Sequence, residues 1–212
     1  MNQKVRNTFE MTRAFYKGHL KSANKAYPYS EGTREKKRTE DSFTANKQIS
    51  DLRDMLDVSK RSPQENGEYL YKNDVRYGNC AEMTCVALYL ADTQFHINKS
   101  QLFLATLRGL DRSSNGVEFG HDFALIKLDD GKWCVDPWAN ICCSLSEYQT
   151  EFRKQMEHWT QKGKRLALRG SDTSLYWAVP NEGVVLSILA KEIKYGEVPY
   201  SSRTSNQGCI LS

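Results

Sequence analysis

Three residues whose types together support nucleophilic acyl chemistry lie at separate points of the chain. Cys80 follows Gly78-Asn79, His121 lies in the run G-H-D-F-A-L-I, and Asp136 lies in V-D-P-W. A thiolate can attack an acyl carbon, an imidazole can carry the proton, and a carboxylate can hold the imidazole in place. These three side chains are therefore the candidates for a catalytic triad.

Cys80 opens a segment, CAEMTCVALYLAD, that is apolar on every face, which predicts a buried helix. At a helix start, the dipole and the unpaired N–H groups stabilise a thiolate and lower its pKa. The same N–H groups can form half of an oxyanion hole. An isolated cysteine is more often a packed core residue. We expect that simpler role for Cys85, Cys134, Cys142 and Cys143.

His121 and Asp136 fall on two predicted strands that form an antiparallel hairpin. With a loop of four residues, 128–131, Lys127 pairs with Lys132 and His121 lies opposite Trp138. Asp136 then shares a face with His121 as its diagonal neighbour, within side-chain reach. A loop of three residues would place Asp136 on the wrong face, so the register is a prediction that a structure can test.

Other residues of the same types are weaker candidates. Asp122 follows His121 directly, so its side chain points to the opposite face of the strand. The remaining histidines, His19, His96 and His158, have no comparable setting.

In this order along the chain, the three motifs resemble the papain-fold Cys-His-Asp enzymes of bacterial toxins and effectors. Relatives of this kind include the catalytic domain of the Pasteurella mitogenic toxin and similar protein glutamine deamidases. The resemblance covers residues 78–138, less than a third of the chain. It implies that Cys80 is the nucleophile, His121 the general base and acid, and Asp136 the orienting residue. Such enzymes convert a glutamine of a target protein to glutamate, and other papain-fold effectors cleave peptide bonds.

The resemblance also implies that a Gln or Asn side chain completes the oxyanion hole. Asn79, Gln64 and Asn73 are the candidates. The motifs do not choose among them.

The elements that must position these residues predict an α+β fold. We expect a papain-like domain in which the buried helix carrying the nucleophile packs on an antiparallel sheet. The expected organisation is a helical, basic segment at 1–62, a catalytic domain at 63–199 and a flexible tail at 200–212. Within it, 21–41 reads as a solvated linker, and Ser62-Pro63 and Asn66-Gly67 as breaks. Further expected elements are strands at Leu102–Leu107, Phe119–Leu128, Lys132–Asp136 and Leu175–Val179, a helix at Ser146–Trp159, and a short helix or strand at Gly183–Lys194.

Composition excludes several classes of protein. The net charge is +4, and residues 1–60 carry 13 Lys and Arg against 8 Asp and Glu, so the basic excess lies in the N-terminal segment. Nucleic-acid binding would require a dense basic face with interleaved aromatics, and the sequence has none.

The six cysteines form no zinc-binding pattern, so we expect neither a metal nor another cofactor. No apolar run is long enough to span a bilayer, and the polar start is not a signal peptide. We therefore expect the cysteines to be mostly reduced.

The last four residues, Cys209-Ile210-Leu211-Ser212, form a C-a-a-X sequence whose final Ser favours farnesylation. The simplest alternative is a chance ending. Prenylation is a eukaryotic modification. Together with the toxin-like motifs, it predicts a bacterial effector that is secreted without a signal peptide and lipidated by its host. Its expected location is the cytoplasmic face of a host membrane, and its expected partners are a host prenyltransferase, that membrane and a host protein substrate.

The sequence therefore predicts a cysteine-nucleophile amide hydrolase that deamidates a glutamine of a host protein. A cysteine protease with the same triad is the first alternative. A transglutaminase, in which an amine replaces water, is a variant of it. A prenylated binding module without enzymatic activity is the alternative from another class.

Overall fold

The computed structural model describes residues 1–17, 22, 25–26, 40, 44, 47–54, 61–111, 117–169, 175–181 and 195–202. These residues form an α+β fold in which helices pack on an antiparallel sheet of eight strands. The helices and strands are α1 (Gln3–Tyr16), β1 (Lys25–Ala26), α3 (Pro63–Lys72), α4 (Cys80–Thr93), the 3-10 turn η2 (Lys99–Gln101), β2 (Leu102–Asp111), β3 (Val117–Leu128), β4 (Gly131–Asp136), β5 (Ile141–Ser144), α5 (Leu145–Gln161), β6 (Arg165–Arg169), β7 (Leu175–Ala178) and β8 (Tyr195–Pro199).

The centre of the sheet is the long antiparallel pair β2–β3. β8 pairs with the outer edge of β2, and β4 pairs with β3 and continues into β5. β6 meets β3 at a single register position, Glu118 with Arg169, and in turn pairs with β1 and β7. Along one edge of β3, therefore, β4 occupies residues 124–128 and β6 occupies residue 118. Among the described residues, the stretch 119–123 between them pairs with no strand on that edge.

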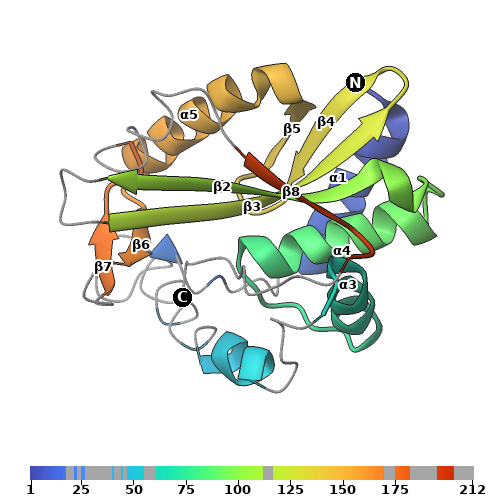
Figure 1. The fold of residues 1–212 in the computed structure, drawn as a ribbon. Coiled ribbons are helices and arrows are strands. Elements are labelled where there is room, and N and C mark those ends of the chain that lie inside the picture. The colour runs from blue at the N-terminus through green and yellow to red at the C-terminus, as the bar shows by residue number, and fades with distance from the viewer. Residues whose placement is uncertain are drawn as a thin grey trace.

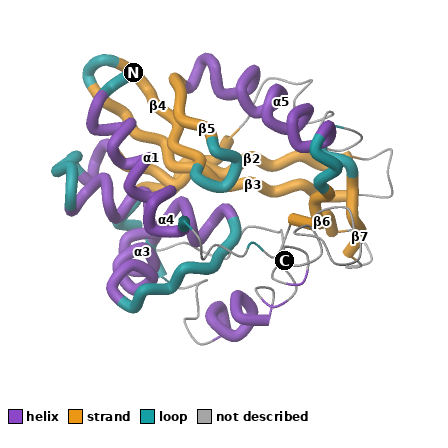
Figure 2. The backbone as a smooth tube through the Cα atoms, turned by 180° about the vertical axis from the view of Figure 1, so that it is seen from behind, coloured by secondary structure: helices purple, strands orange, loops and turns teal. Residues whose placement is uncertain are grey.

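Helices lie on both sides of this sheet. Figures 1 and 2 show α5 on one side and α1, α3 and α4 on the other. α4 packs against β2, β3 and β4, and α5 packs against β4 and β5. α4 is buried almost all round, as its sequence predicts, because α1 and α3 cover the side that faces away from the sheet.

The close approach of α3 to α4 depends on Gly67. A Cβ atom on this residue would lie 2.2 Å from the carbonyl oxygen of Cys85 and 2.8 Å from the Cβ of Tyr89. The expectation of a chain break is wrong at Asn66-Gly67, which lies inside α3, whereas Ser62-Pro63 marks the start of this helix. Ser62 caps α3 through a reciprocal capping box with Glu65, and Pro63 occupies the first turn, where a missing N–H costs nothing.

The N-terminal segment contributes to the core. Val5 and Tyr16 of α1 are buried, as are Ile49 and Leu52 of the helical stretch 47–54. Ser22, which falls in the expected solvated linker, is also buried. That expectation is wrong at Ser22 because its hydroxyl bonds to side chains of the core, as described below.

Most of the elements expected from the sequence are present. α4, α5, β2, β3, β4 and β7 match the expected helices and strands to within a few residues, whereas β5, β6 and β8 were not predicted. Residues 183–194, 203–212 and the rest of 18–60 lie outside the described residues. Tyr200, where the flexible tail was expected to begin, is fully buried, and its backbone bonds to Leu102 and Gln64. The expected start of the tail is therefore wrong at this residue. Within the described part of the chain, no helix has the length and apolarity to cross a bilayer.

Candidate active site

The start of α4 is built around the buried carboxylate of Glu82. The backbone N–H of Asn79 donates to Glu82 Oε2 at 2.9 Å, which caps the helix immediately before Cys80. Gly78 packs directly on Glu82, since a Cβ at this position would lie 2.6 Å from the Glu82 Cβ. The glycine of Gly78-Asn79-Cys80 therefore leaves room for the carboxylate that caps the helix.

Arg53 holds this cap from outside. Its guanidinium donates to both Glu82 oxygens, from Nε at 2.8 Å and from Nη2 at 3.1 Å. Burial favours the neutral form of Glu82, but the charge and hydrogen bonds of Arg53 together with the Asn79 N–H outweigh it, so the pKa of Glu82 is lowered. An ionised Glu82 at the first turn also interacts favourably with the helix dipole.

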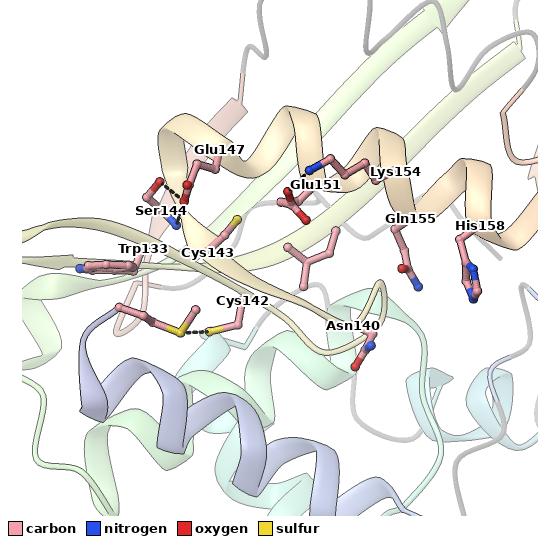
Figure 3. Close-up of a pocket in the computed structure, with 12 residues that line it drawn as sticks. Trp133, Asn140, Cys142, Cys143, Ser144, Glu147, Glu151, Lys154, Gln155 and His158 are labelled. Carbon is pink, nitrogen blue, oxygen red and sulfur yellow. Dashed lines mark hydrogen bonds and ion pairs between the residues drawn. The ribbon is translucent and has the colours of Figure 1, made fainter.

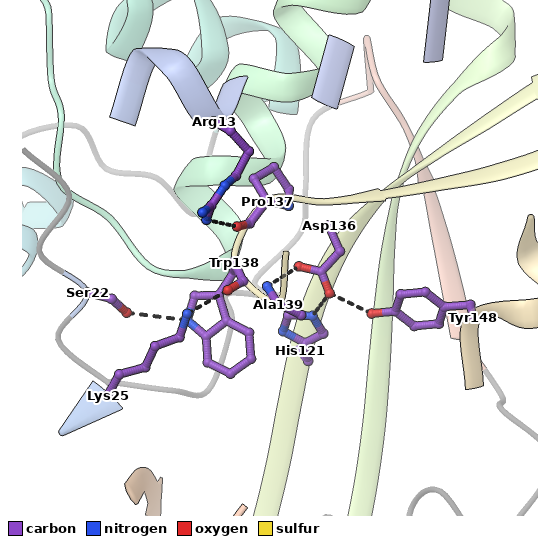
Figure 4. Close-up of polar contacts among 9 residues, drawn as sticks. All are labelled: Arg13, Ser22, Lys25, His121, Asp136, Pro137, Trp138, Ala139 and Tyr148. Atoms are coloured by element: carbon purple, nitrogen blue, oxygen red, sulfur yellow. Dashed lines mark hydrogen bonds and ion pairs between the residues drawn. The ribbon is translucent and has the colours of Figure 1, made fainter. Parts of the chain in front are cut away.

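His121 and Asp136 form a fully buried pair. His121 Nε2 lies 2.7 Å from Asp136 Oδ2. The hydroxyl of Tyr148 donates to the same Oδ2 at 2.8 Å, and the N–H of Ala139 donates to Oδ1 at 2.8 Å (Figure 4). These donors fix the carboxylate, which in turn fixes the ring orientation of His121. With Nε2 bonded to Asp136, Nδ1 is the ring nitrogen that can exchange a proton with a thiol.

The register of the β3–β4 hairpin is the one predicted. Lys127 pairs with Lys132, and Ala124 pairs with Val135. The loop is shorter than expected, because Leu128 and Gly131 also pair and only Asp129 and Asp130 remain in the turn. Shortening the loop by two residues keeps the same side chains on each face, so Asp136 still faces His121.

Asp122 lies on the other face of β3, as predicted. Thr106 Oγ1 donates to Asp122 Oδ1 at 2.7 Å. The charges of Glu82 and Arg53, on the α4 side of the sheet, also act on the pKa of Asp122. Burial is the main cause that raises the pKa of Asp122 to about 6.

A chain of contacts connects the start of α4 to His121. Ser22 Oγ donates to Asn79 Oδ1 at 3.1 Å and accepts from Trp138 Nε1 at 3.3 Å. The Trp138 ring lies 4.7 Å from the His121 ring, centroid to centroid. His121 belongs to the stretch of β3 that has no strand partner on this edge. The contacts between the N-terminus of α4 and the His121–Asp136 pair therefore run past the stretch of β3, residues 119–123, that has no strand partner on this edge among the described residues.

Cys80 is fully buried and takes part in a disulfide in this structure. Cys80 is therefore an exception to the expectation of mostly reduced cysteines, and in this form its sulfur cannot attack a substrate. The other described cysteines, Cys85, Cys134, Cys142 and Cys143, are free thiols.

Burial makes these four thiols poor nucleophiles. It raises the pKa of Cys85 and Cys134 well above the ordinary thiol value, that of Cys142 to about 11 and that of Cys143 to about 12. At neutral pH the thiolate fraction of all four is therefore very small.

The three oxyanion-hole candidates have different surroundings. Asn79 is buried next to Cys80, and its Oδ1 accepts from Ser22. Gln64 is half-buried on α3, where its backbone N–H donates to Tyr200. Asn73 is exposed, and its side-chain amide donates to the Tyr69 carbonyl at the end of its own helix. Of the three, Asn79 is the residue that directly precedes Cys80 at the buried start of α4.

Sequence reasoning missed several residues of the site. Tyr148 lies in the helix expected at Ser146–Trp159 but was not singled out, and its hydroxyl reaches Asp136 because α5 packs across β4. Ser22 carried no signal of its own, since its contact with Trp138 joins segments 116 residues apart.

A separate hollow of about 600 Å³, whose lining includes neither His121 nor Asp136, lies between β5, α5 and Met1 (Figure 3). It is lined by residues of the outer side of α5, among them Glu147, Glu151 and Lys154. The buried side of the same helix carries Tyr148 and faces Asp136. Within the described residues, no group of three or more His, Cys, Asp and Glu side chains could hold a metal ion.

Comparison with known proteins adds no family to this picture. No family model, no curated protein and no solved structure matches the chain. The α+β fold and the geometry around His121 and Asp136 are therefore the observations on which a function can be proposed.

Proposed function

We propose that this protein is a papain-like cysteine hydrolase that deamidates a glutamine of another protein, with Cys80, His121 and Asp136 as its catalytic residues. The observation that carries the proposal is the buried bond between His121 Nε2 and Asp136 Oδ2, fixed from two further sides by Tyr148 and Ala139. A buried imidazole held by an oriented carboxylate is the arrangement that activates a nucleophile. The bridge from Trp138 through Ser22 to Asn79 supports Cys80 as that nucleophile.

The reaction runs in two steps on these residues. The Cys80 thiolate attacks the carboxamide carbon of glutamine, and the proton taken up by His121 passes to the departing nitrogen, which leaves as ammonia. Water then attacks the thioester, His121 accepts a proton from it, and the carboxylate of glutamate leaves as Cys80 is regenerated. The N–H groups at the start of α4, next to the Asn79 side chain, stabilise the oxyanion in both steps.

Asp136 holds the His121 ring in place through both steps of this scheme. It stabilises the imidazolium that forms transiently and keeps Nδ1 directed away from itself and available for the proton. The hydroxyl of Tyr148 and the N–H of Ala139 prevent the carboxylate from rotating, which keeps His121 in one orientation. Because Cys80 and His121 are fully buried, substrate entry requires a local opening, and reduction of Cys80 precedes catalysis.

The test of this function is mass spectrometry of host-cell proteins exposed to the reduced protein. The expected result is an intact target in which one glutamine has become glutamate, absent with Cys80→Ala and retained with the matched control Cys142→Ala. New N-termini in the target would indicate a protease instead, and a glutamine joined to an amine would indicate a transglutaminase. Unchanged host proteins together with specific retention of one of them would favour the binding module.

The C-terminal C-a-a-X sequence supports the second part of the proposal, a bacterial effector that its host prenylates. Cys209 lies outside the described residues, so the argument is the sequence Cys-Ile-Leu-Ser itself. One lipid chain gives only marginal membrane binding, and the basic N-terminal segment supplies a second attraction to an anionic membrane. Cys209→Ser, or a farnesyltransferase inhibitor, should move a tagged protein from host membranes to the cytosol. Unchanged localisation would mean that the C-a-a-X sequence is a chance ending and is not prenylated.

A further inference from the structure

Two free thiols face each other across β4 and β5. Cys134 of β4 lies directly opposite Cys143 of β5 in the antiparallel register, and both are buried. Residues directly opposite each other in such a ladder point to the same face of the sheet, so the two sulfur atoms lie on one side. The thiol pair, formed by Cys134 and Cys143, has no part in the proposed mechanism.

The register brings the thiol pair to the separation that a disulfide needs. Directly opposite residues of an antiparallel pair have Cα atoms about 4.5–5.5 Å apart. Cysteines joined by a disulfide have Cα atoms about 4.4–6.8 Å apart. The backbones of β4 and β5 therefore already meet this requirement, and rotation of the two side chains can bring the sulfurs together. Burial, followed by the charge of Cys143, raises the pKa of Cys134, which agrees with the closeness of the two thiols.

The neighbouring thiol of Cys142 is not placed to replace that of Cys143. Cys142 pairs with Val135 and therefore points to the opposite face of the sheet. Its sulfur lies 3.6 Å from Met1 Sδ and 4.0 Å from the Val5 carbonyl oxygen. Figure 3 shows the side chains of Cys142 and Cys143 on opposite sides of β5. The register thus separates two adjacent cysteines, one of which can serve as a matched control.

The hollow between β5 and α5 gives a reagent access to one member of the thiol pair. Its lining includes Cys143 but not Cys134, and its volume is about 600 Å³. Hollows of roughly 300–1,000 Å³ hold small organic molecules. A small disulfide can therefore meet Cys143 first, with Cys134 behind it as the second thiol.

The reaction of Cys143 should be slow at neutral pH. Burial, followed by the charge of Glu147, raises the pKa of the Cys143 thiol to about 12, and Cys142, Glu151 and Asp136 act in the same direction. Only the thiolate attacks a disulfide, so the rate should increase as the pH rises.

We infer that Cys134 and Cys143 form a modification site at which a small-molecule disulfide, such as glutathione disulfide, introduces a covalent bond between β4 and β5. The Cys143 thiolate attacks one sulfur of glutathione disulfide, the S–S bond breaks, and one glutathione leaves as a thiolate that takes up the proton lost by Cys143. The Cys134 thiolate then attacks the Cys143 sulfur of the mixed disulfide, and the second glutathione leaves in the same way. The two cysteines are oxidised to one disulfide, and glutathione disulfide is reduced to two molecules of glutathione.

The new bond would enclose the turn that holds Asp136. This turn includes Ala139, whose N–H donates to Asp136 Oδ1 at 2.8 Å. Cys143 directly precedes Ser144, the N-cap residue of α5, so the bond also ties the start of α5 to β4. Amide exchange of the turn 137–140 should slow in the linked protein, because β5 can no longer separate from β4. This result does not depend on whether the protein is a hydrolase.

The experiment treats the full-length protein, without reductant and at about pH 8.5, with glutathione disulfide. Remaining thiols are blocked with iodoacetamide, and the protein is digested with trypsin, which leaves the three cysteines of β4 and β5 on the peptide 133–153. The expected product carries the alkyl group on Cys142 alone, and its other two cysteines have lost their hydrogens. A protease that cuts before Asp136 should leave the two halves of this peptide joined until a reductant is added.

Two variants test the choice of partner. Cys142→Ala is the matched control and should form the bond with a yield within about twofold of the wild type, because the register of the thiol pair is unchanged. Cys143→Ala leaves Cys142 as the alternative on β5, and the yield of a bond to Cys134 should fall at least about tenfold. Circular dichroism spectra check that both variants are folded.

Three results would overturn the inference. The first is that all three cysteines of the peptide 133–153 remain open to alkylation, although the same reagent oxidises free dithiothreitol. The second is a glutathione that stays on Cys143 without passing on to Cys134, or a bond that contains Cys142. The third is amide exchange at 137–140 that is equally fast in the linked and the reduced protein.

Discussion

Asp136 is the residue through which most of the candidate site is held. Its two carboxylate oxygens accept from one side chain on β3, one on α5 and one backbone N–H in the turn after β4. Each donor satisfies a buried charge that would otherwise be costly, and each also removes a degree of freedom from the His121 ring. The same contacts therefore stabilise the fold and orient the general base.

Tyr148→Phe tests this dual role, because it deletes a single hydroxyl without changing the shape of the ring. The carboxylate of Asp136 then loses one of its donors, which should lower the free energy of unfolding by about 1–2 kcal/mol. Chemical denaturation measures this loss, and turnover of the target glutamine should fall with it. Tyr69→Phe on α3 is the control, and an equal effect of both variants would contradict the role of Tyr148.

Cys80 should be the most reactive thiol of the reduced protein, although it is buried. The helix start and the imidazole of His121 favour its thiolate, whereas burial raises the pKa of Cys142 to about 11. After reduction and removal of the reductant, iodoacetamide at neutral pH should label Cys80 before the more exposed Cys142. Labelling, mapped by mass spectrometry, should slow by about tenfold in His121→Ala. Faster labelling of Cys142 or Cys143 would remove Cys80 from the nucleophile role.

At the scale of elements, the site depends on how α4 is held at its first turn. Glu82 caps it, Arg53 from the stretch 47–54 pairs with Glu82, and Gly78 leaves room for the Glu82 side chain. α3 packs closely against α4 at Gly67. The stretch 47–54 and α3 together therefore fix the direction of α4, the helix that begins with Cys80.

Gly67→Ala should destabilise the protein, even though Ala has the higher helix propensity. The new methyl group would meet the Cys85 carbonyl at 2.2 Å, so α3 and α4 must separate, at a cost of about 1–3 kcal/mol. Gly196→Ala on β8 is the matched control, because nothing lies within 4 Å of its added Cβ. Thermal unfolding of the two variants gives the comparison, and equal melting temperatures would show that the helices adjust without cost.

Local patterns explain which of these elements could be predicted. The β3–β4 register followed from the two-residue period of strands, and α4 followed from a run of apolar residues longer than a strand. β5 and β8 were missed because they are short. α3 was missed because Asn66-Gly67 indicates a turn as long as the packing of α3 against α4 is not known. Lys25 and Ser22 join the site through contacts with Trp138 more than a hundred residues away, and no local pattern encodes such contacts.

At the scale of the whole molecule, the pH dependence of stability reflects two buried carboxylates with opposite behaviour. The lowered pKa of Glu82 stabilises the fold above the pKa of the unfolded chain, and this contribution disappears as the pH falls through the folded value. Asp122 acts the other way. Its pKa of about 6 means that the folded state binds the proton more tightly than the unfolded state does, so stability decreases as the pH rises from about 4 to about 6.

Asp122→Asn should isolate this second contribution. The amide oxygen can still accept from Thr106 Oγ1, but no buried charge forms at any pH. Relative to the wild type, the variant should therefore gain stability as the pH rises from 4 to 6, by at most about 3 kcal/mol, and keep that gain at pH 7. Guanidinium unfolding at each pH measures the difference between the two proteins, which cancels the titration of groups that they share. Asp129→Asn, in the exposed β3–β4 turn, is the control and should show no such trend. A difference between wild type and Asp122→Asn that stays constant from pH 4 to 7 would mean that Asp122 titrates in the folded protein as it does in the unfolded chain.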